Sequence, residues 1–143
     1  MTVKAILSRK GRDVLTIAPT ANLSEAVKLL AERRIGAVIV TGPDDRVAGI
    51  LSERDIVRTL AARGPQALDD NVAAVMTRKV TTCTEADTIA AIMERMTAGK
   101  FRHMPVVDQG KLAGVISIGD VVKYRVEEIE GETEALREYI ATA

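Results

Sequence analysis

The sequence has few of the residues that build metal centres and nucleophilic active sites. Its single cysteine, Cys83, excludes an internal disulfide, and with a single histidine no cluster has the spacing of zinc ligands. Cys83 lies in an extended stretch with no base nearby in sequence, which favours a buried bystander over a nucleophile. We therefore expect a fold that requires no metal.

An excess of charge of one sign and a long apolar run are also missing. Twenty basic and twenty acidic residues cancel to a formal net charge of zero, so nothing in the overall field attracts nucleic acid or an anionic membrane. The longest apolar runs, such as residues 37–40, fall far short of the ~20 residues that span a bilayer. Residues 1–4 do not open a signal peptide. The sequence predicts a cytoplasmic protein with no nucleic-acid or membrane partner.

Catalytic motifs are missing as well. The sequence has no Gly-x-x-x-x-Gly-Lys phosphate loop, and one cysteine and one histidine do not supply a nucleophile, a base and an orienting group. We predict that the chain is not an enzyme.

What the sequence does contain is an internal repeat. Gly-Ile-Leu-Ser-Glu-Arg-Asp-Ile-Val-Arg at residues 49–58 returns 65 positions later as Gly-Val-Ile-Ser-Ile-Gly-Asp-Val-Val-Lys at residues 114–123. A chain of 143 residues, 47% of them hydrophobic, has the size of one domain. The repeat therefore predicts two similar units that share a core, with any site at their junction present in two related copies.

Hydrophobic periodicity assigns the same elements to both units. Each has a short β-prone segment (14–17 and 79–82), an amphipathic helix, two apolar strands joined by a turn, and a second helix. The fold class is α+β, with the order β-α-β-β-α in each repeat. We divide the chain into an N-terminal helix with repeat 1 (1–64), a linker (65–71), repeat 2 (72–126) and a C-terminal helix (127–143), whose apolar pattern is interrupted by Gly131.

With this element order and both Gly-x-x-Ser-x-x-Asp segments, the chain resembles a tandem pair of cystathionine-β-synthase (CBS) domains, a Bateman module of the stand-alone bacterial type. Val-Met-Thr at 75–77 and Met-Pro-Val-Val-Asp at 104–108 are further points of resemblance. The resemblance implies two repeats packed through their sheets with pseudo-two-fold symmetry. It also implies clefts that bind adenosine-containing ligands, a regulatory role and a homodimer.

The repeated Ser-x-x-Asp has two interpretations that do not exclude each other. A carboxylate at a strand-to-helix turn can accept hydrogen bonds from both hydroxyls of a ribose, and the serine with the free N–H groups of the helix start suits a phosphate. The same spacing is also a near relative of the capping box, in which the two side chains satisfy each other's backbone donors.

The resemblance assigns residues to two clefts. To the cleft of Ser117 and Asp120 it adds residues from the lead-in of repeat 1 and from the segment before its first long strand: Lys10, Asp13, Leu15, Ile35 and Gly36. To the cleft of Ser52 and Asp55 it adds Thr77, Val80, Phe101 and Arg102.

The two copies differ in their cations. Arg102 and His103 are candidates for holding phosphate charge, and Arg54 is a further one. Because repeat 1 has Gly36 and Ala37 where repeat 2 has Arg102 and His103, we expect the Asp120 cleft to bind more tightly.

The sequence thus predicts a sensor of adenine nucleotides, with AMP favoured and ATP, ADP or NAD(H) possible, acting on an unknown protein target. The alternative is an interaction module without a ligand, in which the Ser-x-x-Asp segments only cap helices.

Overall fold

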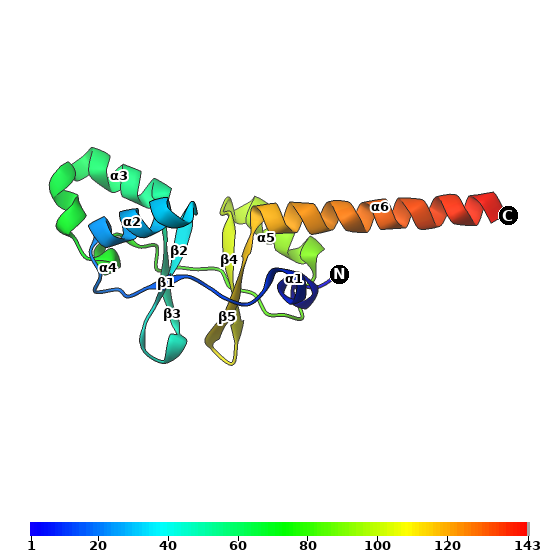
Figure 1. Cartoon of the computed structure of the whole chain (residues 1–143), viewed down its shortest axis with the longest axis horizontal. Helices are drawn as coiled ribbons and strands as arrows, with labels where there is room; N and C mark the ends of the chain where they lie inside the picture. Colours follow the sequence, from blue (N-terminus) through cyan, green and yellow to red (C-terminus); the bar gives the residue numbers. More distant parts are fainter. Residues whose placement is uncertain (143) are drawn as a thin grey trace.

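Each half of the chain folds around a β-hairpin covered by helices (Figure 1). The computed structural model describes residues 1–142. Its α-helices are α1 (Val3–Lys10), α2 (Leu23–Arg33), α3 (Glu53–Arg63), α4 (Val72–Val75), α5 (Ile89–Gly99) and α6 (Ile118–Thr142). Its strands are β1 (Thr16–Ile17), β2 (Ala37–Thr41), β3 (Val47–Ser52), β4 (His103–Asp108) and β5 (Lys111–Ser117), with 3-10 helices η1 (Pro43–Asp45) and η2 (Pro65–Asp69).

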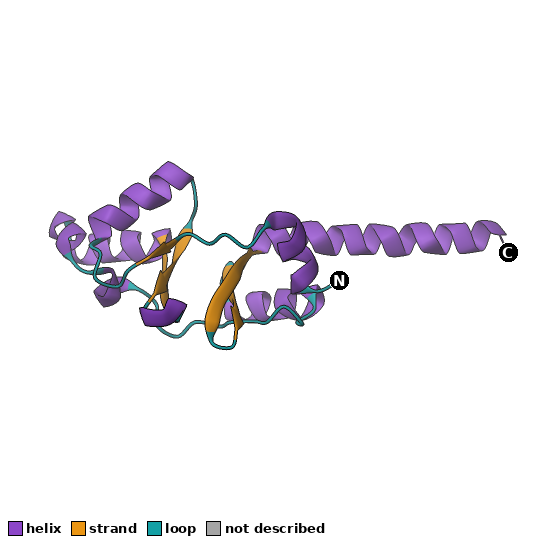
Figure 2. Cartoon of the chain, turned by 60° about the horizontal axis from the view of Figure 1, so that its bottom comes forward, coloured by secondary structure: helices purple, strands orange, loops and turns teal. Residues whose placement is uncertain are grey.

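The strands form two small sheets. In repeat 1, β1 pairs parallel with β2, and β2 pairs antiparallel with β3; in repeat 2, β4 and β5 form an antiparallel hairpin. The two sheets lie next to each other at the centre of the molecule, with the helices outside them (Figure 2). This confirms the predicted α+β architecture. One predicted strand is wrong, since residues 79–82 are coil and only Cys83 makes a single parallel bridge, to Val106.

The first helix of each repeat begins where the sequence places a cap. The side chain of Asn22 accepts a hydrogen bond from the Glu25 amide at 2.9 Å, and Thr88 accepts one from the Ala91 amide at 3.2 Å. The helical spacing then turns one apolar face inward. The buried residues of these faces are Leu23, Ala26 and Leu30 in α2, and Ile89, Ile92 and Met96 in α5.

The buried side chains form two clusters, so the prediction of one shared core is wrong. The reason is that each repeat receives a segment from elsewhere in the chain. Helix α1 supplies Val3, Ile6 and Leu7 to the cluster of repeat 2, and Val72 in α4 joins the cluster of repeat 1 with Met76. Figure 1 shows α1 beside α5 and α6, and α4 beside α2 and α3.

The glycine of each repeated motif lies where a crossing segment meets the hairpin. A Cβ atom on Gly49 would lie 2.7 Å from the carbonyl oxygen of Thr77, and one on Gly114 would lie 2.9 Å from Cδ2 of Leu7. Both distances are too short for real contacts, so glycine is what allows the two segments to pack this closely.

Helix α6 is longer than predicted. It combines the second helix of repeat 2 with the C-terminal helix, so the predicted boundary between residues 126 and 127 lies inside one element that continues through Gly131. From residue 130 onward its side chains are exposed, and Figure 1 shows it extending away from the body. The predicted linker holds η2, where Ala67 is fully buried.

Candidate functional site

Both Ser-x-x-Asp segments form capping boxes. The Ser52 amide donates to Oδ2 of Asp55 at 3.0 Å and the Asp55 amide donates to Oγ of Ser52 at 3.2 Å; the corresponding distances for Ser117 and Asp120 are 3.0 and 3.1 Å. The capping interpretation is therefore confirmed for both copies. It leaves the second carboxylate oxygen of each aspartate outside the cap, so a ligand role remains open to both.

The Asp120 copy is held by a lysine. Nζ of Lys10, the last residue of α1, lies 2.6 Å from Oδ2 of Asp120 and 2.9 Å from the carbonyl oxygen of Val115. Burial disfavours the charged form of Asp120, but the hydrogen bonds from Lys10 and Ser117 outweigh it, so the pKa of this carboxyl lies below its usual value.

The Asp55 copy has weaker neighbours. Oγ1 of Thr77 lies 3.5 Å from Oδ2 of Asp55, and Nη1 of Arg58 lies 3.9 Å from Oδ1. Both distances are at or beyond the upper limit of a hydrogen bond, so the carboxylate is open to stronger donors.

A cavity of about 440 Å³ opens beside Asp55, within the usual range of ligand pockets. It lies between the start of α3, the coil before α5 and the segment that leads into β4. It is lined by Gly36, Ile50, Ser52, Glu53, Arg54, Asp55, Arg58, Thr77, Lys79, Val80, Thr81, Gly99, Lys100, Phe101, Arg102 and His103.

The lining of this cavity has an excess of positive charge, whereas the chain as a whole has a formal net charge of zero. The cations Arg54, Arg58, Lys79, Lys100 and Arg102 outnumber the carboxylates. The apolar side chains of Ile50, Val80 and Phe101 supply surfaces against which a flat ring can pack. The arrangement therefore suits an anionic ligand with one apolar, planar part.

The structure distributes the predicted site residues over two places. The Asp55 cavity collects Gly36, Ser52, Arg54, Asp55, Thr77, Val80, Phe101, Arg102 and His103. Lys10 meets Asp120 beside Ser117, whereas Asp13 is exposed and Leu15 is half-buried on the connection from α1 to β1. Contacts of Asp13, Leu15 and Ile35 with a ligand remain predictions.

The segments before β2 and β4 are fixed by equivalent backbone hydrogen bonds. The Glu53 amide donates to the carbonyl of Gly36 at 2.9 Å, and the Ile118 amide donates to the carbonyl of Arg102 at 2.8 Å. Each helix start is thereby tied to the residues in front of the hairpin. This explains why Arg102 and His103 lie between the two copies of the motif.

The surroundings of His103 favour its neutral form. Its burial lowers its pKa, Lys10 and Arg102 lower it further, and Asp120 and Glu53 offset only part of the effect. The neutral imidazole can both donate and accept a hydrogen bond.

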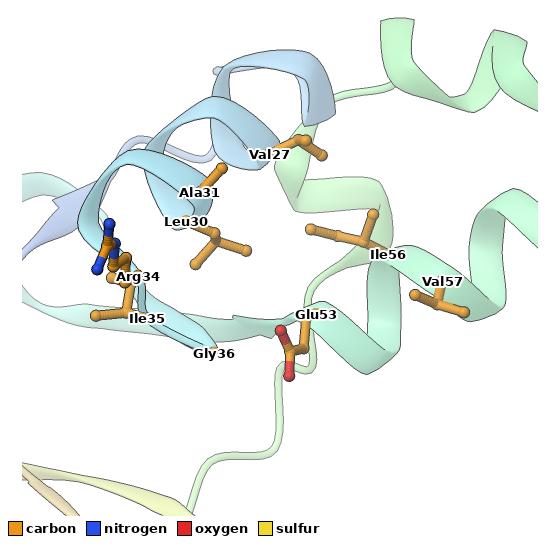
Figure 3. A pocket seen from close by; sticks show the side chains of 9 residues that line it. All are labelled: Val27, Leu30, Ala31, Arg34, Ile35, Gly36, Glu53, Ile56 and Val57. Carbon is orange, nitrogen blue, oxygen red and sulfur yellow. The ribbon is translucent and has the colours of Figure 1, made fainter.

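A second cavity, of about 480 Å³, lies between α2 and α3. Figure 3 shows its mostly aliphatic lining, with Val27 and Val57 at the rim and Ile35 near Gly36 at one end. Val57 is 65% exposed. Arg34 and Glu53 are the charged residues of its lining and carry opposite charges, so it lacks the excess of cations found beside Asp55.

Sequence reasoning missed several residues of the Asp55 cavity. Glu53 and Arg58 belong to the same helix start as Arg54 and Asp55, and Lys79 and Lys100 stand directly beside predicted residues. Their proximity to Val80 and Phe101 in sequence was the available signal.

Cys83 has the character of an inert thiol. It is 2% exposed, and burial, assisted by Asp87, raises its pKa to about 12. The prediction of a buried bystander is confirmed.

Within residues 1–142, no group of three or more His, Cys, Asp or Glu is placed to hold a metal ion. None of the described helices combines the length and apolarity needed to cross a membrane.

Comparison with known proteins identifies the family. The CBS domain family model matches residues 3–62 and 72–127. The chain belongs to the CBS domain family. CBS domains are generally regulatory modules, and this chain contains a tandem pair of them.

Three relatives illustrate the range of similarity. The mitochondrial CBS domain-containing protein CBSX3 of Arabidopsis thaliana is 31% identical over 97% of this chain and 71% of its own length. The crystal structure of a CBS-domain-containing protein from Agrobacterium tumefaciens is 48% identical, with a TM-score of 0.83 over 87% of this chain and 99% of that one. A CBS domain protein from Pyrobaculum aerophilum, complexed with AMP, is 30% identical, with a TM-score of 0.74 over 84% of this chain and 89% of that one.

Proposed function

We propose that this CBS pair is a regulatory module that binds an adenine nucleotide, with AMP favoured, in the cavity beside Asp55. The observation that carries the proposal is the lining of that cavity, where an aspartate at a helix start, an excess of cations and apolar side chains meet. The AMP complex of the Pyrobaculum aerophilum relative supports the class of ligand. ADP, ATP and NAD(H) share the groups that such a lining recognises.

Each part of the nucleotide has a counterpart in the lining. The carboxylate of Asp55 accepts the ribose hydroxyls, because it offers two oxygens to two neighbouring donors. Arg54 and Arg102 bind phosphate oxygens, and Val80 with Phe101 packs against the adenine. No catalytic step is part of the proposal.

The test is calorimetric titration with AMP, ADP, ATP, NAD, NADH and S-adenosylmethionine. We expect AMP to bind, and at 100 times its Kd to add about 2.7 kcal/mol to the free energy of unfolding. Asp55→Ala removes the ribose acceptor and should weaken binding at least tenfold, whereas Asp120→Ala should change it little. This departs from the sequence-based prediction of tighter binding at Asp120, because Arg102 and His103 line the Asp55 cavity and Lys10 pairs with Asp120. A chain that responds to none of the six ligands contradicts the proposal, and a larger loss in Asp120→Ala places the site in the other cleft.

We also propose that the module works as a homodimer that presents α6 to its partner copy. Five exposed apolar residues follow a heptad stripe with spacings of four, three, seven and four, in which Thr133 takes the position between the third and the fourth: Val122, Val126, Ile129, Leu136 and Ile140. In a parallel pair of such helices, Arg125 would face Glu130 of the other copy, and Glu132 would face Arg137. Binding of a nucleotide can change the packing of this dimer only by its difference in affinity between two arrangements.

The alternative function is an interaction module that needs no ligand. The complete capping boxes favour it, because both Ser-x-x-Asp segments have a structural task without a nucleotide. An interaction module gives no reason for the cluster of cations beside Asp55. The titration with the six ligands distinguishes it from a nucleotide-binding module.

A further inference from the structure

Lys10 distinguishes the two clefts. Its side chain is 32% exposed, and its ammonium group has two acceptors, Oδ2 of Asp120 and the carbonyl oxygen of Val115. The Asp120 side chain is 21% exposed, so the ion pair is partly shielded from water. A partly buried, charge-assisted hydrogen bond of 2.6 Å is among the stronger polar contacts that a side chain makes.

The internal repeat contains the same site without the lysine. The residue 65 positions after Lys10 is Val75, which has no charge to offer Asp55. Asp55 instead has the hydroxyl of Thr77 at 3.5 Å, and the 440 Å³ cavity opens beside it. The chain thus carries one copy of the motif with a lysine 2.6 Å from its aspartate and one whose aspartate has only the exposed Arg58, at 3.9 Å.

The backbone of Lys10 is fixed in place. Helix α1 buries Val3, Ile6 and Leu7 in the core of repeat 2, and each of them is at most 1% exposed. The Gly11 amide also donates to the carbonyl of Leu7 at 2.8 Å and ends the helix there. The ammonium group can therefore leave Asp120 only by rotation of its own side chain.

A ribose that approaches Asp120 competes with this ammonium group. The carboxylate already accepts hydrogen bonds from the Ser117 amide and from Lys10 on the same oxygen, Oδ2. A ribose that bonds both carboxylate oxygens has to displace the ammonium group from Oδ2, and this leaves the cation without its partly buried anionic partner. At Asp55 the competing cation is Arg58, whose Nη1 lies 3.9 Å from Oδ1 on a side chain that is 77% exposed, so it holds the carboxylate more weakly than Lys10 holds Asp120.

We propose that Lys10 acts as a lock on the Asp120 cleft, so that each chain binds one adenosine ligand, at Asp55. The lock rests on the proposed function, because it decides which of two similar clefts the nucleotide enters. It makes the module a sensor with a single site per chain, although the motif is present twice.

The experiment counts binding sites with AMP as the probe, by equilibrium dialysis and calorimetry. The wild type is compared with Lys10→Val, which copies the sequence of the other cleft, with Lys10→Met, which keeps the length of the side chain, and with Lys10→Arg, which keeps the charge. Circular dichroism and thermal melting confirm that each variant is folded. We expect about one AMP per chain for wild type and Lys10→Arg, and about two for Lys10→Met and Lys10→Val. Adding Asp120→Asn to Lys10→Met should return the count to about one.

Three results would overturn the lock: two sites in the wild type, an unchanged count in both Lys10→Met and Lys10→Val, or loss of the single site in these variants, which would make Lys10 a ligand contact. None of them contradicts nucleotide binding itself. If wild type binds no AMP, the proposed function fails, and the lock is judged by Lys10→Met alone. A gained site that Asp120→Asn removes supports the lock, and no gain overturns it.

Discussion

The environment of His103 makes the stability of the fold depend on pH near neutrality. Burial first, and then Lys10 and Arg102, hold the pKa of His103 in the folded state below its ordinary value of 6.5. As the pH falls through 6.5, the unfolded chain therefore takes up a proton that the folded chain does not, and stability is lost from there downward. We expect the free energy of unfolding, measured with urea, to be lower at about pH 5.5 than at about pH 7.5.

The control for this prediction is His103→Gln, which cannot take up the proton. The lowered pKa values of Asp87 and Asp120 also reduce stability in acid, but only as the pH approaches and falls below their ordinary value of 3.8. The variant should therefore lose most of the difference between pH 5.5 and 7.5. If it keeps the full difference, another group is responsible.

Among the elements, α6 makes the clearest prediction. Its outer half has nothing from its own chain to cover Leu136 and Ile140, which are 59% and 66% exposed. If these residues pair with those of a second copy, Leu136→Glu combined with Ile140→Glu buries unpaired charge at the seam and should shift the mass measured by light scattering from dimer to monomer. Glu134→Gln and Glu138→Gln lie off the stripe, so this double variant should stay dimeric. A wild-type chain that is monomeric at micromolar concentration refutes the pairing.

The helices and strands also show which parts of the fold the sequence can predict and which it cannot. Helices and hairpins followed from apolar spacing, because α2 and α5 each bury one face. The interruption of the apolar pattern at Gly131 predicts a separate C-terminal helix, and this is wrong. Glycine ends a helix mainly when it adopts a left-handed conformation, and Gly131 is not among the described glycines with positive φ. A single helical glycine costs only about 1 kcal/mol. The pairing of Lys10 with Asp120 could not be foreseen from spacing, because it depends on α1 crossing to repeat 2.

For the whole molecule, we expect the exchange of α1 and α4 between the repeats to make the two cores unfold together. Ile6 is fully buried in the cluster of repeat 2, although it precedes repeat 1 in sequence. We expect Ile6→Ala to destabilise the fold by about 2–5 kcal/mol, which is the usual cost of such a truncation. Since residues 11–15 run directly from α1 into β1, we expect the loss to lower the stability of both repeats together.

Cys83 provides the measurement, because it is the only thiol in the sequence and lies buried in the cluster of repeat 2. Its labelling by a thiol reagent along a urea gradient reports opening of that cluster, whereas far-ultraviolet circular dichroism reports all helices. In a single cooperative transition the two midpoints coincide, and Ile6→Ala moves both to lower urea by the same amount. Ala90→Ser, an exposed change at the start of α5, serves as a control that should move neither midpoint appreciably. Labelling of Cys83 well before the loss of circular dichroism would mean that repeat 2 opens alone, and that the exchanged helices do not make the two repeats interdependent.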